Sequence, residues 1–161
     1  MHTTKADLKE AVQALIQRRM QASAQQLKLL DDARAETERL FSDIESWIAG
    51  VDFVNSVRQE LTVTIVGATD AVSRELRKLT VSILDNEVTV EPASPFDPED
   101  PRFHINGFAK PLALYRLACK EAYGVEVLET MQPLNVEFDS NFFLYHLVAL
   151  LNAAQAKPPL D

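Results

Sequence analysis

The stretch that decides the fold is residues 7–48, which read DLKEAVQALIQRRMQASAQQLKLLDDARAETERLFSDIESWI. It contains neither glycine nor proline, because the first glycine of the chain is Gly50 and the first proline is Pro92. These two residue types most readily interrupt a helix, so their absence favours one long helix of about 60 Å. Thr4, three residues before Asp7, predicts a variant capping box at its start.

One side of this expected helix is apolar along its length, while the opposite side carries mostly Glu, Asp, Gln and Arg. The apolar face is wider than the two positions in seven of a two-stranded coiled coil. It therefore favours packing among three or more helices, or against the rest of the chain as well as a partner. The residues that we expect to bind a partner lie on its two main heptad lines: Ile16, Met20, Leu27, Leu30, Phe41, Ile44 and Ile48.

The alternative is a helical hairpin that turns near Asp31 and Asp32, where an aspartate could cap a second helix. A hairpin loop normally contains glycine or proline, and this region contains neither. The sequence therefore favours the continuous helix. We expect residues 1–50 to be an oligomerisation or interaction segment that resembles a coiled coil.

After Gly50 the apolar pattern changes to strict alternation, which is typical of half-buried strands. It predicts three strands, over residues 61–65, 79–83 and 88–91. Asp85 and Asn86 tolerate positive φ and suit a two-residue hairpin turn between the last two strands. This turn would place Ile83 opposite Val88 in an antiparallel sheet.

Residues 92–103 form a proline-rich acidic stretch, which we expect to be a loop because proline cannot donate to a sheet interior. Pro111 and Gly124 suit the first turn and the end of a helix, so a helix is expected between them. Two further short strands are expected, over residues 125–128 and 134–138.

A last helix is expected to begin at a cap formed by Asp139 or Ser140 and to form the centre of the core. Together the elements predict an α+β fold in the order α-βββ-α-ββ-α. The globular domain spans residues 51–157, and residues 158–161 form a tail. This order resembles that of the small acidic dimeric chaperones of type III secretion effectors, a similarity of plan that indicates no function by itself.

The chain carries 24 acidic and 16 basic residues, a net charge of −8 that disfavours binding to nucleic acid. Cys119 is its only cysteine, so a reducing compartment is expected. No apolar run lies beside the charges of the N-terminus, and the longest one, Phe142 to Leu151, is shorter than the about 20 residues of a membrane helix. We therefore expect a cytoplasmic protein with no membrane partner.

No combination of residues predicts a catalytic or cofactor site, and we expect no cofactor. Residues 66–76 resemble the strand-to-helix turn of a dinucleotide-binding dehydrogenase. Asp70 and Ser73, however, stand where that pattern requires glycine, and Asp70 would oppose a phosphate. We expect a turn and a short helical segment there.

Cys119 with His104 or His146 could form a nucleophile and base. The favoured interpretation is structural, because Cys119 lies on the apolar face of its expected helix and buried cysteine packs as a small hydrophobe. His146 lies within the most apolar expected helix and is interpreted as a core residue. The three histidines share no metal-ligand spacing, so no metal site is expected.

The leading hypothesis is a non-enzymatic interaction protein: an oligomeric adaptor, scaffold or chaperone-like subunit that binds itself or another helical protein. One alternative is a small-molecule-binding domain or enzyme with a pocket near Phe108 and Tyr115. Another is a nucleic-acid-associated regulator that uses Arg74, Arg77 and Lys78. A docking loop for a basic partner is also possible in the acidic stretch, formed by Phe96, Asp97, Glu99, Asp100 and Phe103.

Overall fold

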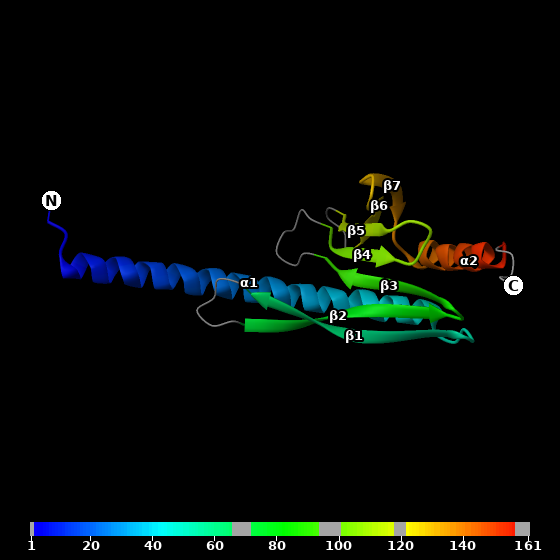
Figure 1. Ribbon diagram of the computed structural model, residues 1–161, viewed down its shortest axis with the longest axis horizontal. Coiled ribbons are helices and arrows are strands. Elements are labelled where there is room, and N and C mark those ends of the chain that lie inside the picture. The colour runs from blue at the N-terminus through cyan, green and yellow to red at the C-terminus, as the bar shows by residue number, and fades with distance from the viewer. Residues whose placement is uncertain (1, 66–71, 94–100, 118–121, 157–161) are drawn as a thin grey trace, which may run out of the picture.

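The computed structural model describes residues 2–65, 72–93, 101–117 and 122–156. These residues form a long helix, α1 (Lys5–Ile48), then seven strands and a second helix, α2 (Ser140–Ala156) (Figure 1). The strands are β1 (Val54–Ile65), β2 (Val72–Ile83), β3 (Asn86–Pro92), β4 (Phe103–Asn106), β5 (Leu112–Arg116), β6 (Tyr123–Val127) and β7 (Gln132–Glu137). The predicted α+β class and the long N-terminal helix are confirmed.

Helix α1 runs without interruption through Asp31 and Asp32, so the hairpin alternative is wrong. Its 44 residues correspond to a length of about 66 Å. The predicted capping box is present at its start. The backbone N–H of Asp7 donates to the Thr4 hydroxyl at 3.3 Å, and the backbone N–H of Thr4 donates to the Asp7 carboxylate at 2.9 Å.

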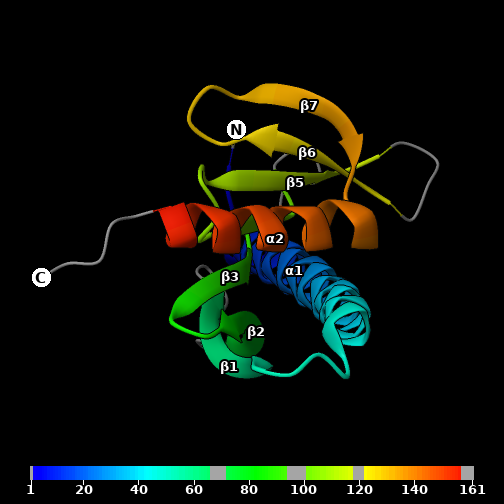
Figure 2. The same cartoon turned by 90° about the vertical axis from the view of Figure 1, so that its right-hand side faces the viewer.

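The strands form one antiparallel sheet in which each strand pairs with the next along the chain. Seen along the long axis of the molecule, β1–β3 and β5–β7 lie on opposite sides of the two helices, so the sheet curves around them (Figure 2). The core fills this curve. It joins Phe41 and Ile44 of α1 to Val90 of the sheet and to Phe143 and Leu147 of α2.

The hairpin between β2 and β3 has the predicted apolar face but a different register. Val81 lies opposite Val88, and Ile83 lies opposite Asn86, so the pairing is two residues away from the prediction. The turn residues are Leu84 and Asp85, and Leu84 adopts a φ of +52°. A shift of two residues keeps every side chain on its face, which is why the apolar pattern could not distinguish the two registers.

The helix expected between Pro111 and Gly124 is wrong: the chain forms β5 and β6 there instead. Gly124 ends no helix. It lies opposite Tyr115, and a Cβ added to it would lie 2.4 Å from the Tyr115 ring. The glycine therefore lets the ring cross the neighbouring strand. Because the expected order of elements depended on this helix, the resemblance to the secretion chaperones in that order does not hold.

Three smaller expectations also change. The short helical segment expected before residue 78 is wrong, because β2 already begins at Val72; residues 66–71 lie outside the described part of the chain. Phe103 is not in a loop but begins β4, where its side chain is buried. Helix α2 buries Phe143 and Leu147 but exposes Tyr145 and Val148, so it covers one side of the core rather than forming its centre.

The backbone at Gly107, which follows β4, lies very close to the backbone of β3. Its φ is +114°, and an added Cβ would lie 2.2 Å from the backbone oxygen of Glu87. We expect Gly107→Ala to lower the free energy of unfolding by about 3 kcal/mol, because both strain and a backbone clash oppose it. Chemical denaturation measures this difference.

Gly50→Ala is the matched control. Gly50 also has a positive φ, +81°, but no atom lies within 4 Å of an added Cβ. It should cost only the conformational strain, about 1 kcal/mol. Equal effects of the two substitutions would contradict the close approach at Gly107.

Candidate interaction site

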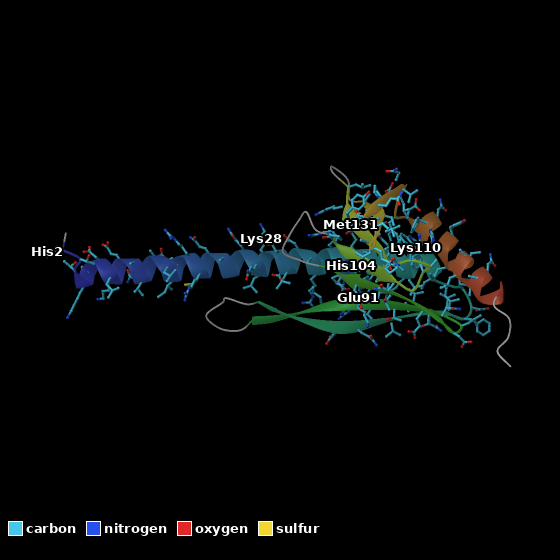
Figure 3. The ribbon with its side chains drawn as sticks, turned by 45° about the horizontal axis from the view of Figure 1, so that its top comes forward. His2, Lys28, Glu91, His104, Lys110 and Met131 are labelled. Atoms are coloured by element: carbon cyan, nitrogen blue, oxygen red, sulfur yellow. The ribbon has the colours of Figure 1, made fainter. Side chains whose placement is uncertain are left out.

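The N-terminal part of α1, which we call the arm (Lys5–Leu29), extends beyond the sheet (Figure 1). None of the described side chains before Leu30 is buried. Leu8 is 63% exposed and Met20 is 62% exposed. Around the first turns of the arm, near His2, the side chains point away from the helix and no described strand or second helix lies beside them (Figure 3). The arm is therefore a helix without its own core.

Three of the exposed apolar side chains of the arm, those of Leu8, Val12 and Leu15, lie in line with side chains that α1 buries further along. Five turns of an α-helix contain 18 residues, so residues 18 apart lie on the same side. Val12 is therefore in line with buried Leu30, and Leu15 with buried Ala33. Leu8 and Ile44 are related in the same way over ten turns. The sheet covers this side in one half of the helix and leaves it uncovered in the other.

This division separates the residues predicted to bind a partner. Phe41, Ile44 and Ile48 are buried in the core that α1 shares with the sheet, and Leu30 is also buried. Leu27 is half-buried. Ile16 and Met20 are exposed, and they remain available to a partner. The arm adds Leu8, Val12, Leu15 and Leu29, which also expose large apolar surfaces. The heptad pattern of the whole helix did not single these residues out, because they lie beside its two main lines.

The predicted docking loop is not brought together by the described residues. Phe103, one of its two aromatic anchors, is 2% exposed and stacks edge-on against the Tyr123 ring. It is a core residue. The other members of the loop (Phe96, Asp97, Glu99 and Asp100) lie outside the described part of the chain.

A polar cluster anchors α1 just after the arm ends. Glu36 is 7% exposed, accepts a hydrogen bond from Tyr123 at 2.6 Å and pairs with Arg102 at 2.8 Å. Burial by itself raises the pKa of Glu36, but the hydrogen bonds from Arg102 and Tyr123 outweigh it and hold the pKa below its ordinary value. Burial and the Glu36 carboxylate raise the pKa of Tyr123, so the phenol stays a donor. The charged carboxylate of Glu36 therefore links α1 to the β6 side of the sheet. We call this set of contacts the Glu36 link.

A second set of ion pairs fastens α1 to the opposite edge of the sheet. Arg58 of β1 donates to Glu45 at 2.5 Å and also pairs with Glu38. Its guanidinium lies 5.8 Å from the centroid of the Phe41 ring. Because β1 and β6 both hold α1, the helix cannot slide along the sheet without breaking contacts on two sides. The arm consequently projects at a set position and direction.

A second apolar surface lies between β7 and α2, which we call the β7–α2 groove. It has a volume of about 610 Å³ and is lined by Leu134, Val136, Glu137, Asp139, Phe142 and Tyr145, with Asn141 and His146 beside them. Strand β7 is the last strand of the sheet, and its side chains are all exposed. Asp139 caps α2, because its carboxylate accepts the backbone N–H of Phe142 at 2.9 Å. The lining of the groove is therefore mostly apolar, and it includes two carboxylates, those of Glu137 and Asp139, which we call the acidic rim.

The residues considered for catalysis are not assembled by the described part of the chain. His146 packs against the Phe142 ring at 4.2 Å, and burial lowers its pKa. His104 belongs to β4, and Cys119 lies outside the described residues. No group of three or more potential metal ligands occurs among the residues described.

The two alternative binding sites have partial structural counterparts. Phe108 lines two small hollows of about 230 and 240 Å³, but Tyr115 lines neither. In the expected basic cluster, Arg77 lies 3.7 Å from Glu38 and Lys78 lies 3.8 Å from Glu91. Acidic neighbours thus offset these two cations. The side chain of Arg74 lies outside the described part.

No known protein family, curated protein or solved structure matches this chain. Neither described helix combines the length and the apolar character needed to cross a membrane. The arm and the β7–α2 groove are therefore the features of the molecule that indicate a function.

Glu36→Gln tests the Glu36 link. We expect it to lower the free energy of unfolding at neutral pH by about 2 kcal/mol, because charge-assisted hydrogen bonds are lost. The pKa of Glu36 is lowered by folding, so its contribution is complete above the ordinary carboxyl pKa of about 4.3 and is lost as the pH falls through the folded value. Melting curves over a pH series measure this effect. As the pH is lowered, the melting temperature of the variant should fall less than that of the wild type.

Glu10→Gln provides the control, because Glu10 is an exposed carboxylate of the arm. It should leave both the melting temperature and its pH dependence unchanged. If acid lowered the melting temperature of Glu36→Gln as much as that of the wild type, the charge of Glu36 would not contribute to the Glu36 link.

Proposed function

We propose that this protein is an interaction protein, an oligomeric adaptor or scaffold, that associates with a second copy of itself through the apolar side of the arm. The observation that carries the proposal is a row of large apolar side chains on the part of α1 that extends past the core. The row consists of Leu8, Val12, Leu15, Ile16 and Met20. Single exposed apolar residues are ordinary on a protein surface, but a contiguous row marks an interaction surface.

The energetics of burial favour association. Fully burying an exposed Val, Leu, Ile or Met side chain contributes about 2 kcal/mol. The five side chains of the row are between 47% and 63% exposed, so covering them offers a gross gain of about 5 kcal/mol, before the costs of association are subtracted. A partner must therefore cover the whole row, or add contacts of its own, to bind with useful affinity.

The arm is also prepared for binding by its continuity with the body. A separate helix gains stability only slowly with its length in water, because its first turn is costly to form. Here the buried half of α1 supplies that first turn, and the arm extends from it as one helix. A partner therefore meets an ordered surface, which reduces the entropy lost on binding.

Leu15→Glu combined with Ile16→Glu tests this function. Two charges in the middle of the row should oppose burial, and we expect the double variant to be a monomer under conditions where the wild type is an oligomer. Light scattering coupled to gel filtration, repeated from micromolar to millimolar concentration, measures the mass of each.

Gln17→Glu combined with Gln21→Glu is the matched control, since it adds the same charge to the opposite side of the arm. This control should have the same mass in solution as the wild type. At concentrations low enough for all three proteins to be monomers, both double variants should melt at the temperature of the wild type. A wild type that stays monomeric at every concentration would refute the proposed function.

A further inference from the structure

The β7–α2 groove and the arm have complementary surfaces. The groove offers exposed apolar side chains, among them Val136 of β7 at 44% and Tyr145 of α2 at 70%, and β7 has a neighbouring strand on one side only. The arm offers an apolar row with no described element of its own chain beside its first turns. Each surface needs cover of the kind that the other provides, because an amphipathic helix binds by placing its apolar face in an apolar groove.

Their charges are also opposite. Glu137 and Asp139 form the acidic rim of the groove, and no lysine or arginine of the described residues lines it; Lys110 lines the neighbouring hollow instead. Residues 1–29 contain five basic and two acidic side chains, a net charge of +3. Residues 30–161 contain 11 basic and 22 acidic side chains, a net charge of −11. The arm is thus the basic part of an acidic protein.

The basic side chains of the arm lie beside its apolar row. Residues three or four apart on a helix are neighbours on its surface. Lys5 stands three residues before Leu8, and Lys9 stands three residues before Val12. Arg19 follows Leu15 by four residues. A groove that covers the row therefore brings its acidic rim close to these cations.

The arm cannot reach the groove of its own chain. The Phe138 ring lies 5.7 Å from the Trp47 ring and 5.8 Å from the Phe142 ring, so the groove is near the C-terminal end of α1. The arm is the opposite end of that same unbroken helix, about 66 Å long, and α2 lies far from the N-terminus (Figure 1). Only the groove of another copy is accessible to it.

We infer that the arm of one copy docks in the β7–α2 groove of a second copy, whose own arm docks in return. Two copies lying side by side in opposite directions bring each N-terminal arm to the other's C-terminal end of α1. Two equivalent contacts then close the pair, as twofold symmetry requires. The inference rests on the proposed function and adds to it the receptor surface and the stoichiometry: an antiparallel dimer.

Val136→Asp tests the groove, and Val57→Asp is its control. Both replace an exposed strand valine, because Val57 of β1 is 55% exposed and lies outside the groove. Sedimentation equilibrium should show at least about a hundredfold weaker dimer for Val136→Asp, since a carboxylate would be buried against apolar side chains. Val57→Asp should keep the wild-type dissociation constant.

Mixing separates this arrangement from direct pairing of the two arms. The Leu15→Glu and Ile16→Glu double variant has a defective arm and an intact groove, whereas Val136→Asp has an intact arm and a defective groove. An equimolar mixture should recover dimers, because one intact arm–groove contact can form between the two kinds of chain. Arm-to-arm pairing predicts that Val136→Asp dimerises normally by itself and that mixing gives no mixed dimer.

Charge exchange tests the rim. Lys9→Glu and Glu137→Lys should each weaken the dimer about tenfold at low salt, and a chain carrying both should regain most of the loss. If the arm variants lose the dimer while Val136→Asp, Glu137→Lys and Val57→Asp all keep it, the groove is not the receptor and the proposed function stands. A monomeric wild type would overturn both.

Discussion

The burial of the C-terminal half of α1 inside the curved sheet is the constraint on which the rest of the structure depends. Phe41 and Ile44 provide the apolar surface over which the strands close, and neither is exposed to solvent. Glu36 and Arg58 then hold the helix from the two sides of the sheet. Because α1 has 44 residues, the sheet is too narrow to cover all of it. The arm is what remains when the longest element of the fold exceeds the core that it helps to build.

Incomplete cover also produces the groove at the other end of the molecule. Helix α2 buries Phe143 and Leu147 against the core and leaves its other side in solvent. Strand β7 ends the sheet, and its exposed side chains line the groove together with residues of that helix. An antiparallel sheet that does not close into a barrel must leave such an edge, and an uncovered edge invites another polypeptide. The molecule thus has one uncovered surface at each end, a basic helix and an acidic groove.

The elements that the sequence predicted well were those whose pattern is local. The continuous helix followed from a run without glycine or proline, and its cap followed from Thr4 and Asp7. The hairpin strands β2 and β3 followed from alternation, although their register did not. The helix between Pro111 and Gly124 failed because its residues can form either structure in isolation. The neighbouring strands β4 and β6, and the room that Gly124 leaves for Tyr115, selected the extended form.

By itself the sequence determined that α1 has one apolar side, because the 3.6-residue period of a helix places those residues together wherever the helix forms. Only the tertiary structure decided which part of that side is already used. Ile44 and Val12 look alike in the sequence, yet Ile44 is covered by the chain's own sheet and Val12 is exposed. The β7–α2 groove could not be read from the sequence at all, since Val136 and Tyr145 belong to different elements. Burial depends on contacts between segments distant in the chain, and no local pattern records how far a sheet extends along a helix.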